Sequence, residues 1–338
     1  MHNHYRLLGG YRALLAILVL VSHTHMWLPT WVGPLALGNV GVLSFFVLSR
    51  FVIAEACDIF YPGRPVRFLT NRLLRIYPTY WAACGIAIAI YVWIPHPEFN
   101  PNAYDVFANL TIVLAERMNS NELRLISVIW AVGIELRFYV LAALIDYVDR
   151  LMTRRGNLQA GQLMAAVGVV SLALYFYSWT TDFGKLTVLR FAPFFVFGFV
   201  YYRWVRYQSV ASLLLGLLAL LTTAHSYNAY ISLGTGTSTL HSSLIFLFGL
   251  ILFVGLARVT RAPKYLERID KRLGDLTYSI YLVHWPIVYA VGRSGLQGYE
   301  AFIAALMFSL GASAIIVSVV EKPLLQLRDS IRRARLYS

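Results

Sequence analysis

Residues 11–25, YRALLAILVLVSHTH, carry ionisable side chains in a segment that is otherwise apolar. Arg12 stands near its start, and His23 and His25 stand at its end. An arginine in the hydrocarbon core of a bilayer costs at least ~2.5–3.5 kcal/mol, so ionisable residues retained there are candidates for function. A neutral imidazole can act as a general base, and a guanidinium can bind phosphate oxygens.

The spacing of Arg12 and His23 places both side chains on one side of a helix. Eleven residues rise by about 16 Å and make close to three turns. We therefore predict that Arg12 lies near the inner membrane face, and that His23 lies beyond the midplane and faces the same interior cavity. His25 points about 200° around the helix from His23. A histidine satisfied structurally by neighbouring helices remains the alternative for His23.

Two further ionisable residues are expected near the membrane midplane. Glu135 lies within ISVIWAVGIELRFYVLAAL, with Arg137 beside it, and His284 lies within LTYSIYLVHWPIV. Intramembrane ionisable groups commonly line a site or pathway, which favours function. A structural network of ion pairs is the alternative.

The segment RPVRFLTNRLLRIYPTYW contains two arginines three residues apart, Arg72 and Arg75, which share a helix face. Pro78 is expected to kink or restart this helix. A pair of arginines at the cytoplasmic face can clamp phosphate groups. Ordinary anchoring by positive charge on the inner side is the alternative.

The elements that position these residues are predicted to be membrane-spanning helices. Hydrophobic residues make up 59% of the 338 residues and charged residues only 13%, whereas soluble domains carry about 25% charged residues. The fold class is therefore an all-α, polytopic bundle of about ten spans in a lipid bilayer. The apolar segments near spanning length are 7–27, 35–57, 76–94, 126–148, 160–179, 186–205, 209–225, 240–257, 276–292 and 300–320.

The net charge of +13 is explained by topology and does not indicate a nucleic-acid partner. Most of the 29 Lys and Arg residues fall in loops on one side if ten segments span and both termini are cytoplasmic. If the shorter stretch 104–118 also spanned, every later loop would change sides and the Lys and Arg residues would no longer be concentrated on one side. We expect 104–118 to be a surface or re-entrant helix.

The predicted domain organisation is a single membrane domain over residues 1–323, followed by a basic tail over 324–338. The tail is expected to lie along the cytoplasmic membrane surface. Cys57 and Cys84 lie in or beside apolar runs and are expected to be small buried hydrophobic residues. No cleaved signal peptide is expected, because the first apolar run lacks a small-residue cleavage site.

The ordered set of motifs resembles membrane acyltransferase family 3 over about residues 5–325. This family comprises integral-membrane O-acyltransferases of bacterial surface polysaccharides, Nod factors and some secondary metabolites. The motifs, in order, are R-x10-H (Arg12 to His23), GVLSFFVLSRFVI, RFLTNRLLRIYPTYW, WAVGIELRFYVL, DLTYSIYLVHWPI and VVEKP.

The resemblance implies cytoplasmic acyl-CoA as donor, with acetyl as the expected acyl group, and the hydroxyl of a cell-surface carbohydrate or glycolipid as acceptor. It also implies the bacterial inner membrane, with no permanently bound cofactor and no metal. Arg12 and His23 fall on the family's R-x10-H motif, and Arg72 and Arg75 fall on its RxxR motif. Arg50 departs from the family, which commonly has Gly at that position. A second departure is Ala131, where Ser is common.

The resulting hypothesis makes His23 the general base and gives Arg12 the positioning of acyl-CoA or its carbonyl. Glu135 would orient the base or the acceptor, and His284 would help to polarise the acceptor. The uncharged stretch 225–243 is expected to be an outer loop that contacts a sugar. The rival hypotheses are a transporter or flippase of glycan or lipid-linked substrates, and a non-catalytic membrane scaffold.

Overall fold

The computed structural model describes the residues at 7–94, 102–115, 124–154, 162–180, 190–208, 210–235, 239–259 and 262–333. Within these ranges the secondary structure is helical and contains no strand. The helices of the first half are α1 (Gly9–His23), α2 (Leu37–Glu55), α3 (Pro65–Trp93), α4 (Ala103–Leu110), α5 (Ile112–Ala115) and α6 (Ile129–Arg154). Those of the second half are α7 (Gln162–Thr180), α9 (Ala192–Tyr207), α10 (Val210–Thr235), α11 (Thr239–Leu256), α12 (Lys264–Gly292), α13 (Gly298–Ile316) and α14 (Lys322–Arg333).

Short helical turns extend several of these helices. The π-helical turn η3 (Ala56–Phe60) follows α2, and η5 (Val317–Glu321) joins α13 to α14. The 3₁₀ turn η1 (His25–Trp27) follows α1, and η2 (Gly33–Leu35) precedes α2.

Three helical stretches of the described chain are long and apolar enough to cross a membrane: Gly33–Phe60, Pro65–Trp93 and Gly298–Arg332. Shorter apolar helices occur at Gly9–His23, Ala166–Tyr175 and Leu240–Leu256. Each of the ten predicted spans overlaps a helix in its described part. The prediction of an all-α membrane protein is thus confirmed, whereas the number of crossings and the side of the termini stay predictions.

Pro78 lies inside the continuous α3, so it does not restart a helix there, and a kink at Pro78 stays a prediction. One other detail of the predicted helices was wrong. The stretch 225–243 is not a loop, since α10 continues to Thr235 and α11 begins at Thr239. Polar side chains at the end of α10 find partners within the protein: Ser226 Oγ donates to the Arg190 carbonyl oxygen at 3.0 Å.

The stretch 104–118 contains two short helices over its described part. An Asn102 capping box starts α4, and the backbone becomes extended at Thr111 before α5 begins. Helices of 8 and 4 residues are far shorter than the ~20 residues a span requires. Cys57 and Cys84 are free and buried, as predicted.

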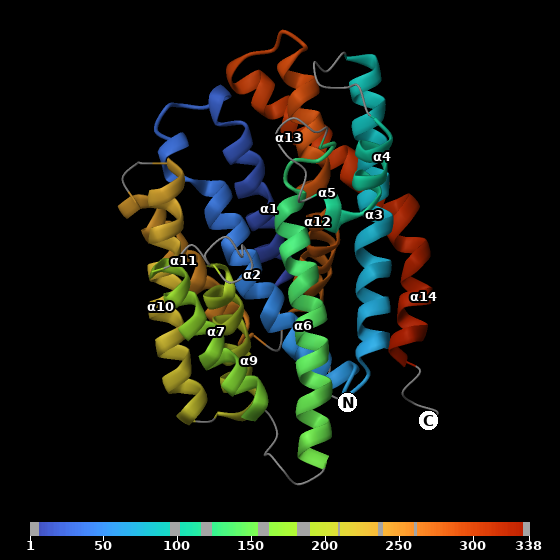
Figure 1. Cartoon of the computed structure of the whole chain (residues 1–338). Helices are drawn as coiled ribbons and strands as arrows, with labels where there is room; N and C mark the ends of the chain where they lie inside the picture. The colour runs from blue at the N-terminus through green and yellow to red at the C-terminus, as the bar shows by residue number, and fades with distance from the viewer. Residues whose placement is uncertain are drawn as a thin grey trace. The chain divides into compact units, whose positions relative to one another are not determined.

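The chain forms two compact units, each assembled from segments distant in sequence. The first unit comprises 1–42, 73–133 and 251–329, and the second comprises 43–72, 134–250 and 330–338. In the first unit α12 packs against both α1 and α13, and α1 and α12 lie side by side (Figure 1). In the second unit α9 packs against α7 and α10.

Helices α1 and α12 run parallel and cross closely near their N-terminal ends, which the predicted topology places on the cytoplasmic side. The Gly9 and Gly10 amides donate to the two carboxylate oxygens of Asp270 at 2.9 and 2.6 Å. A Cβ on Gly9 would lie 2.0 Å from the Asp270 carbonyl oxygen, and one on Gly274 would lie 2.9 Å from the Gly9 Cα. Only glycine at both positions permits this approach.

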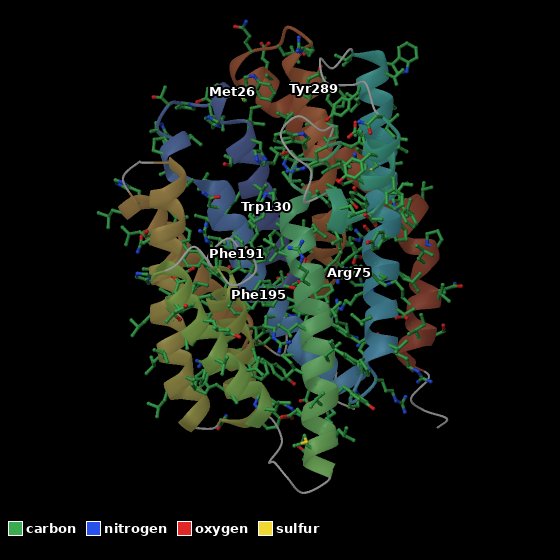
Figure 2. The ribbon with its side chains drawn as sticks, viewed as in Figure 1. Met26, Arg75, Trp130, Phe191, Phe195 and Tyr289 are labelled. Carbon is green, nitrogen blue, oxygen red and sulfur yellow. The ribbon has the colours of Figure 1, made fainter. Side chains whose placement is uncertain are left out.

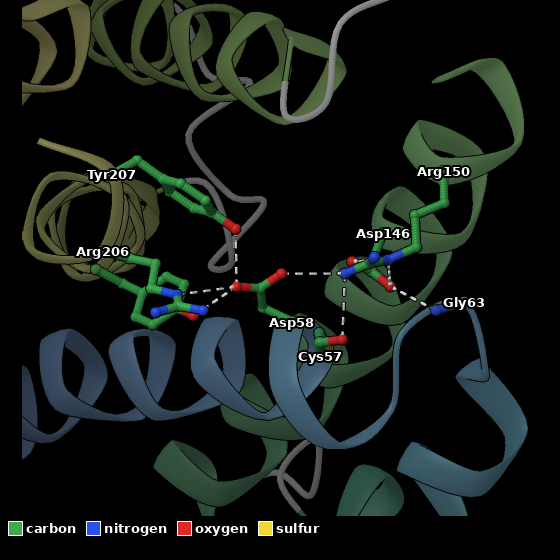
Figure 3. A network of polar contacts seen from close by, with 8 residues as sticks. Cys57, Asp58, Gly63, Asp146, Arg150, Arg206 and Tyr207 are labelled. Atoms are coloured by element: carbon green, nitrogen blue, oxygen red, sulfur yellow. Dashed lines mark hydrogen bonds and ion pairs between the residues drawn. The ribbon is translucent and has the colours of Figure 1, made fainter. Parts of the chain in front are cut away.

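In the second unit a polar network joins η3, α6 and α9 (Figure 3). The Asp58 carboxylate accepts hydrogen bonds from the Tyr202 and Tyr207 hydroxyls at 2.8 Å and from Arg150 Nη2 at 3.4 Å. Arg150 Nε in turn donates to both oxygens of Asp146 at 3.1 Å. Burial would lower the pKa of the Arg150 guanidinium, but the bonds and charges of Asp146 and Asp58 outweigh it and raise that pKa.

Candidate functional site

The structure joins two of the predicted site residues, His23 of α1 and His284 of α12. His23 Nδ1 lies 2.9 Å from His284 Nε2. The two rings are nearly parallel, with an interplanar angle of 12° and centroids 5.1 Å apart. The Trp285 ring packs edge-on against His23, at 5.2 Å and 86°. His23 is half-buried, whereas His284 is 0% exposed, so a reactant can reach only His23.

The hydrogen-bond partners determine which nitrogen of each neutral imidazole carries the proton. His284 Nδ1 lies 3.1 Å from the Ile280 carbonyl oxygen, which can only accept, so this nitrogen is the donor. His284 Nε2 then holds a lone pair and accepts from His23 Nδ1–H. The proton on Nδ1 leaves His23 Nε2 with a free lone pair. The two hydrogen bonds that link the Ile280 carbonyl, His284 and His23 thus leave His23 Nε2 unprotonated, as a general base requires.

His25 differs from His23 in its location, its exposure and its hydrogen-bond partner. It lies in η1 and is exposed, and its Nδ1 is 2.7 Å from the Ser22 carbonyl oxygen. His25 therefore provides a matched control for His23, two residues away.

Arg12 lies close enough to Asp275 to act on its carboxylate electrostatically, and so do Arg75, Lys271 and Arg328. Asp275 stands directly before the predicted span 276–292. Four cations from α1, α3, α12 and α14 therefore act on one exposed carboxylate, so positive charge is in excess here.

The histidine pair and the cation cluster lie at different levels of the first unit. In Figure 2, Met26 and Tyr289 lie toward one end of this unit, and Arg75 lies farther toward the other. On α12, nine residues separate Asp275 from His284, a rise of about 14 Å. Along α12, the position of His284 is thus farther from the predicted cytoplasmic end than the position of Asp275, on which the cations act.

Arg72, the other member of the predicted RxxR pair, belongs to the second unit. Its guanidinium carbon lies 5.3 Å from the centre of the Phe68 ring and 5.7 Å from that of Tyr139. Its Nε is buried and has no hydrogen-bond partner within the described residues. The two rings hold the guanidinium in place by cation–π contacts, and its unpartnered Nε is a donor that still lacks an acceptor in the described part of the chain.

Glu135 also lies in the second unit. Its carboxylate oxygen Oε1 accepts hydrogen bonds from the hydroxyls of Ser49 and Tyr139. Two hydroxyl donors to one oxygen hold this carboxylate in a fixed orientation.

Sequence reasoning gave no role to Glu321 of the VVEKP motif, which the structure places in the first unit. Its Oε1 accepts from Thr79 Oγ1 at 3.1 Å and from Ser279 Oγ at 2.9 Å. Glu321 ends the π-helical turn η5, and such turns are frequent at functional sites. A carboxylate at the end of an otherwise apolar run was the signal that could have identified it.

The comparisons with known proteins agree with the sequence motifs. The profile of a family described as "Acyltransferase domain" matches residues 8–320. The Exopolysaccharide production protein ExoZ of Rhizobium meliloti (strain 1021) is 25% identical over 302 residues, which cover 88% of this chain and 91% of ExoZ. Nodulation protein 10 of Rhizobium leguminosarum bv. viciae is 24% identical over 354 residues, covering 96% of this chain and 94% of that protein.

A further relative is BcsY of Komagataeibacter xylinus, provisionally named a membrane-bound transacylase. It is 21% identical over 350 residues, which cover 96% of this chain and 82% of BcsY. No solved structure matches the chain.

Proposed function

The chain belongs to the acyltransferase 3 family of membrane proteins, and on this premise we propose that it is an O-acyltransferase. It moves an acyl group, acetyl by expectation, from cytoplasmic acyl-CoA to a hydroxyl of a cell-surface or lipid-linked carbohydrate. Family membership favours this enzyme over the transporter and scaffold hypotheses. The names of ExoZ and of Nodulation protein 10, which refer to exopolysaccharide production and nodulation, support a carbohydrate acceptor.

The observation that carries the proposal is the hydrogen bond between His23 Nδ1 and His284 Nε2. It leaves His23 Nε2 unprotonated, and acyl transfer to a hydroxyl requires such a base. His284 is fully buried and acts through His23, so it is a positioning residue.

In the proposed reaction, His23 Nε2 accepts the hydroxyl proton while the acceptor oxygen attacks the thioester carbonyl carbon. A C–O bond forms, the C–S bond breaks, and its electron pair leaves with the CoA sulfur. The proton on His23 passes to that sulfur, which yields free CoA and restores the neutral imidazole. A hydrogen-bond donor or positive group near the carbonyl must stabilise the oxyanion of the intermediate. Arg12 lies about 16 Å along α1 from His23, so its proposed role is to position the acyl-CoA.

The cation cluster around Asp275 supports a donor that carries several phosphates. Arg12, Arg75 and Arg328 lie close to this carboxylate, and arginine binds phosphate oxygens through a planar fork of donors. Arg72, whose buried Nε lacks a hydrogen-bond partner in the described structure, is proposed to contact the same class of ligand.

The proposed topology has ten spans in the bacterial inner membrane, with both termini cytoplasmic. The contacts Gly9–Asp270 and His23–His284 each join residues 261 positions apart, so α1 and α12 run in the same direction. Because successive crossings alternate in direction, a helix parallel to the first crossing must itself be an odd-numbered crossing. Helix α12 is the ninth crossing if 104–118 does not span, and the tenth if it does. The parallel packing of α1 and α12 therefore supports the proposal that 104–118 does not span.

Cysteine labelling in intact cells tests this topology. Cysteines introduced at 58–75 and 258–275 should react only after the membrane is permeabilised, whereas those at 226–239 should react in intact cells. Labelling of 150–158 from outside would mean that 104–118 spans the membrane.

The test of the reaction compares His23→Ala with His25→Ala in lipid nanodiscs. Release of CoA thiol that depends on a glycan acceptor measures turnover. Loss of a general base costs ~10²–10⁴-fold in rate, so His23→Ala should be inactive while still binding acyl-CoA. His25→Ala should retain most activity. An active His23→Ala protein would refute the assignment of the base.

A further inference from the structure

The second unit contains a buried cation without a hydrogen-bonded anion. Arg50 of α2 is 8% exposed, and its Nη1 has no hydrogen-bond partner within the described residues. Its guanidinium carbon lies 4.8 Å from the centre of the Phe199 ring, a contact weaker than an ion pair. Buried charges are normally paired, because an unpaired charge away from water is costly. Arg50 therefore requires an anion.

Two carboxylates in the described part of the same unit, Asp146 and Glu135, are engaged by other groups. Asp146 acts on Arg50 through its charge, but both of its oxygens accept from Arg150 Nε at 3.1 Å. Glu135 accepts hydrogen bonds from Ser49 and Tyr139. Neither of these two carboxylates is available to the Arg50 guanidinium, so an anionic ligand can serve as its partner.

Arg50 lines a groove whose remaining walls are mostly apolar. The groove lies among α2, α6, α7 and α9 and is open on one side; the space between its walls, open solvent included, is about 420 Å³. Its walls include Phe138 and Leu141 of α6, Val167 of α7 and Phe195 of α9. Leu141 is 42% exposed, so the groove reaches the surface of this unit. In a membrane protein such a surface meets hydrocarbon chains.

We propose that this groove binds an amphiphile with one anionic head, a carboxylate or a phosphate, and an apolar chain. The head pairs with the Arg50 guanidinium, and the chain lies against the aromatic and aliphatic walls. Arginine suits this role because its guanidinium presents several donors and is more weakly hydrated than an ammonium. The site needs no catalytic residue named above, so it stands or falls independently of the acyltransferase mechanism.

The experiment uses the full-length protein in phosphatidylcholine nanodiscs with two fluorescent probes, cis-parinarate and its uncharged methyl ester. The two probes share one chain and differ in the anionic head. Wild type should bind cis-parinarate more tightly than the ester. Arg50→Met should weaken cis-parinarate binding about ten- to hundredfold, because a hydrogen bond to a charged group is lost, and should bind both probes equally. Arg50→Lys should retain the preference for the anion.

A second variant tests the chain-binding wall with Arg50 intact. Gly168 lines the groove, and a Cβ there would meet its first neighbour, Val196, at an ordinary 3.6 Å. Gly168→Leu should fill the groove and weaken the binding of both probes. Equal affinity of wild type and Arg50→Met for cis-parinarate would overturn the proposal, as would unchanged binding in Gly168→Leu if Arg50→Met does not fold.

The source of the anion is distinguished by the nanodisc lipid. Replacement of phosphatidylcholine by phosphatidylglycerol should displace cis-parinarate from wild type if a lipid phosphate occupies the site. Retention of the probe identifies a free fatty carboxylate as the occupant. Either result supports an anionic amphiphile, whereas a wild type that binds the methyl ester as tightly as the acid refutes one.

Discussion

Replacement of His284 by Leu tests whether this residue determines the proton position on His23. Leucine is of similar size and suits a fully buried position, but it cannot accept the proton of His23 Nδ1, which now lies 2.9 Å from His284 Nε2. His23 would then be free to carry its proton on Nε2, the nitrogen that must be unprotonated to act as a base. The variant should therefore lose turnover while it retains acyl-CoA binding.

The magnitude of the loss separates two roles for His284. If the hydrogen bond only orients the ring, its removal should cost about 0.5–1.5 kcal/mol, or roughly two- to tenfold in rate. If it also selects the proton position, the base is lost, and the cost should approach the ~10⁴-fold that misplacing this proton costs in serine proteases. We expect a fall in kcat of at least about 10²-fold with KM for acyl-CoA little changed.

His284→Gln is the matched control, because its amide oxygen can accept from His23 Nδ1–H as His284 Nε2 does. It should recover most of the activity that His284→Leu loses. The assay is release of CoA thiol by purified variants in nanodiscs, with melting temperatures recorded alongside. A loss below tenfold in a stable, donor-binding His284→Leu protein would refute control of the proton position. An inactive, stable His284→Gln protein would refute the role of the acceptor atom.

Two further perturbations address the helix crossing and the donor site. Gly9→Ala should lower the free energy of unfolding by ~1–3 kcal/mol through overpacking, since its Cβ would meet a carbonyl oxygen of α12 at 2.0 Å. Gly311→Ala, with no atom within 4 Å of its Cβ, should leave the melting temperature unchanged, and equal melting of the two would contradict the close crossing. Arg72→Ala and Arg75→Ala should each weaken acyl-CoA binding about tenfold or more, because a hydrogen bond to a charged group contributes ~1.5–3 kcal/mol. Exposed Arg67 of the same helix is the control, and equal calorimetric affinity in all three variants would assign the pair to membrane anchoring.

The sequence was sufficient for features that depend on one helix at a time. Apolar length identified the helices, and helical periodicity placed Arg12 and His23 on one face, which the structure directs toward α12. The partner of His23 could not be deduced, because it lies 261 positions away. Periodicity places a residue on a face of its own helix but contains no information about which distant helix packs there.

Polar residues misled the sequence analysis where the protein itself satisfies them. His225 and Ser226 suggested the start of a loop, yet both lie inside α10. His225 Nδ1 lies 2.9 Å from the Tyr175 hydroxyl, and Ser226 Oγ donates to a backbone carbonyl. Hydropathy scores such residues as if water were their partner, so it ends a helix too early wherever tertiary hydrogen bonds replace water.

The constant register between α1 and α12 explains how an apolar helix can hold two chemical groups at different depths. Asp270 anchors the first turn of α1 through its Gly9 and Gly10 amides, and the same offset of 261 positions recurs at His23 and His284. Two contacts at opposite ends fix both the sliding and the rotation of α1 on α12. Arg12 lies between these two contacts on α1, so the same packing of α1 on α12 brings it close enough to act on Asp275 electrostatically. Any change that separates the helices at Gly9 must therefore disturb the base as well as the cation cluster.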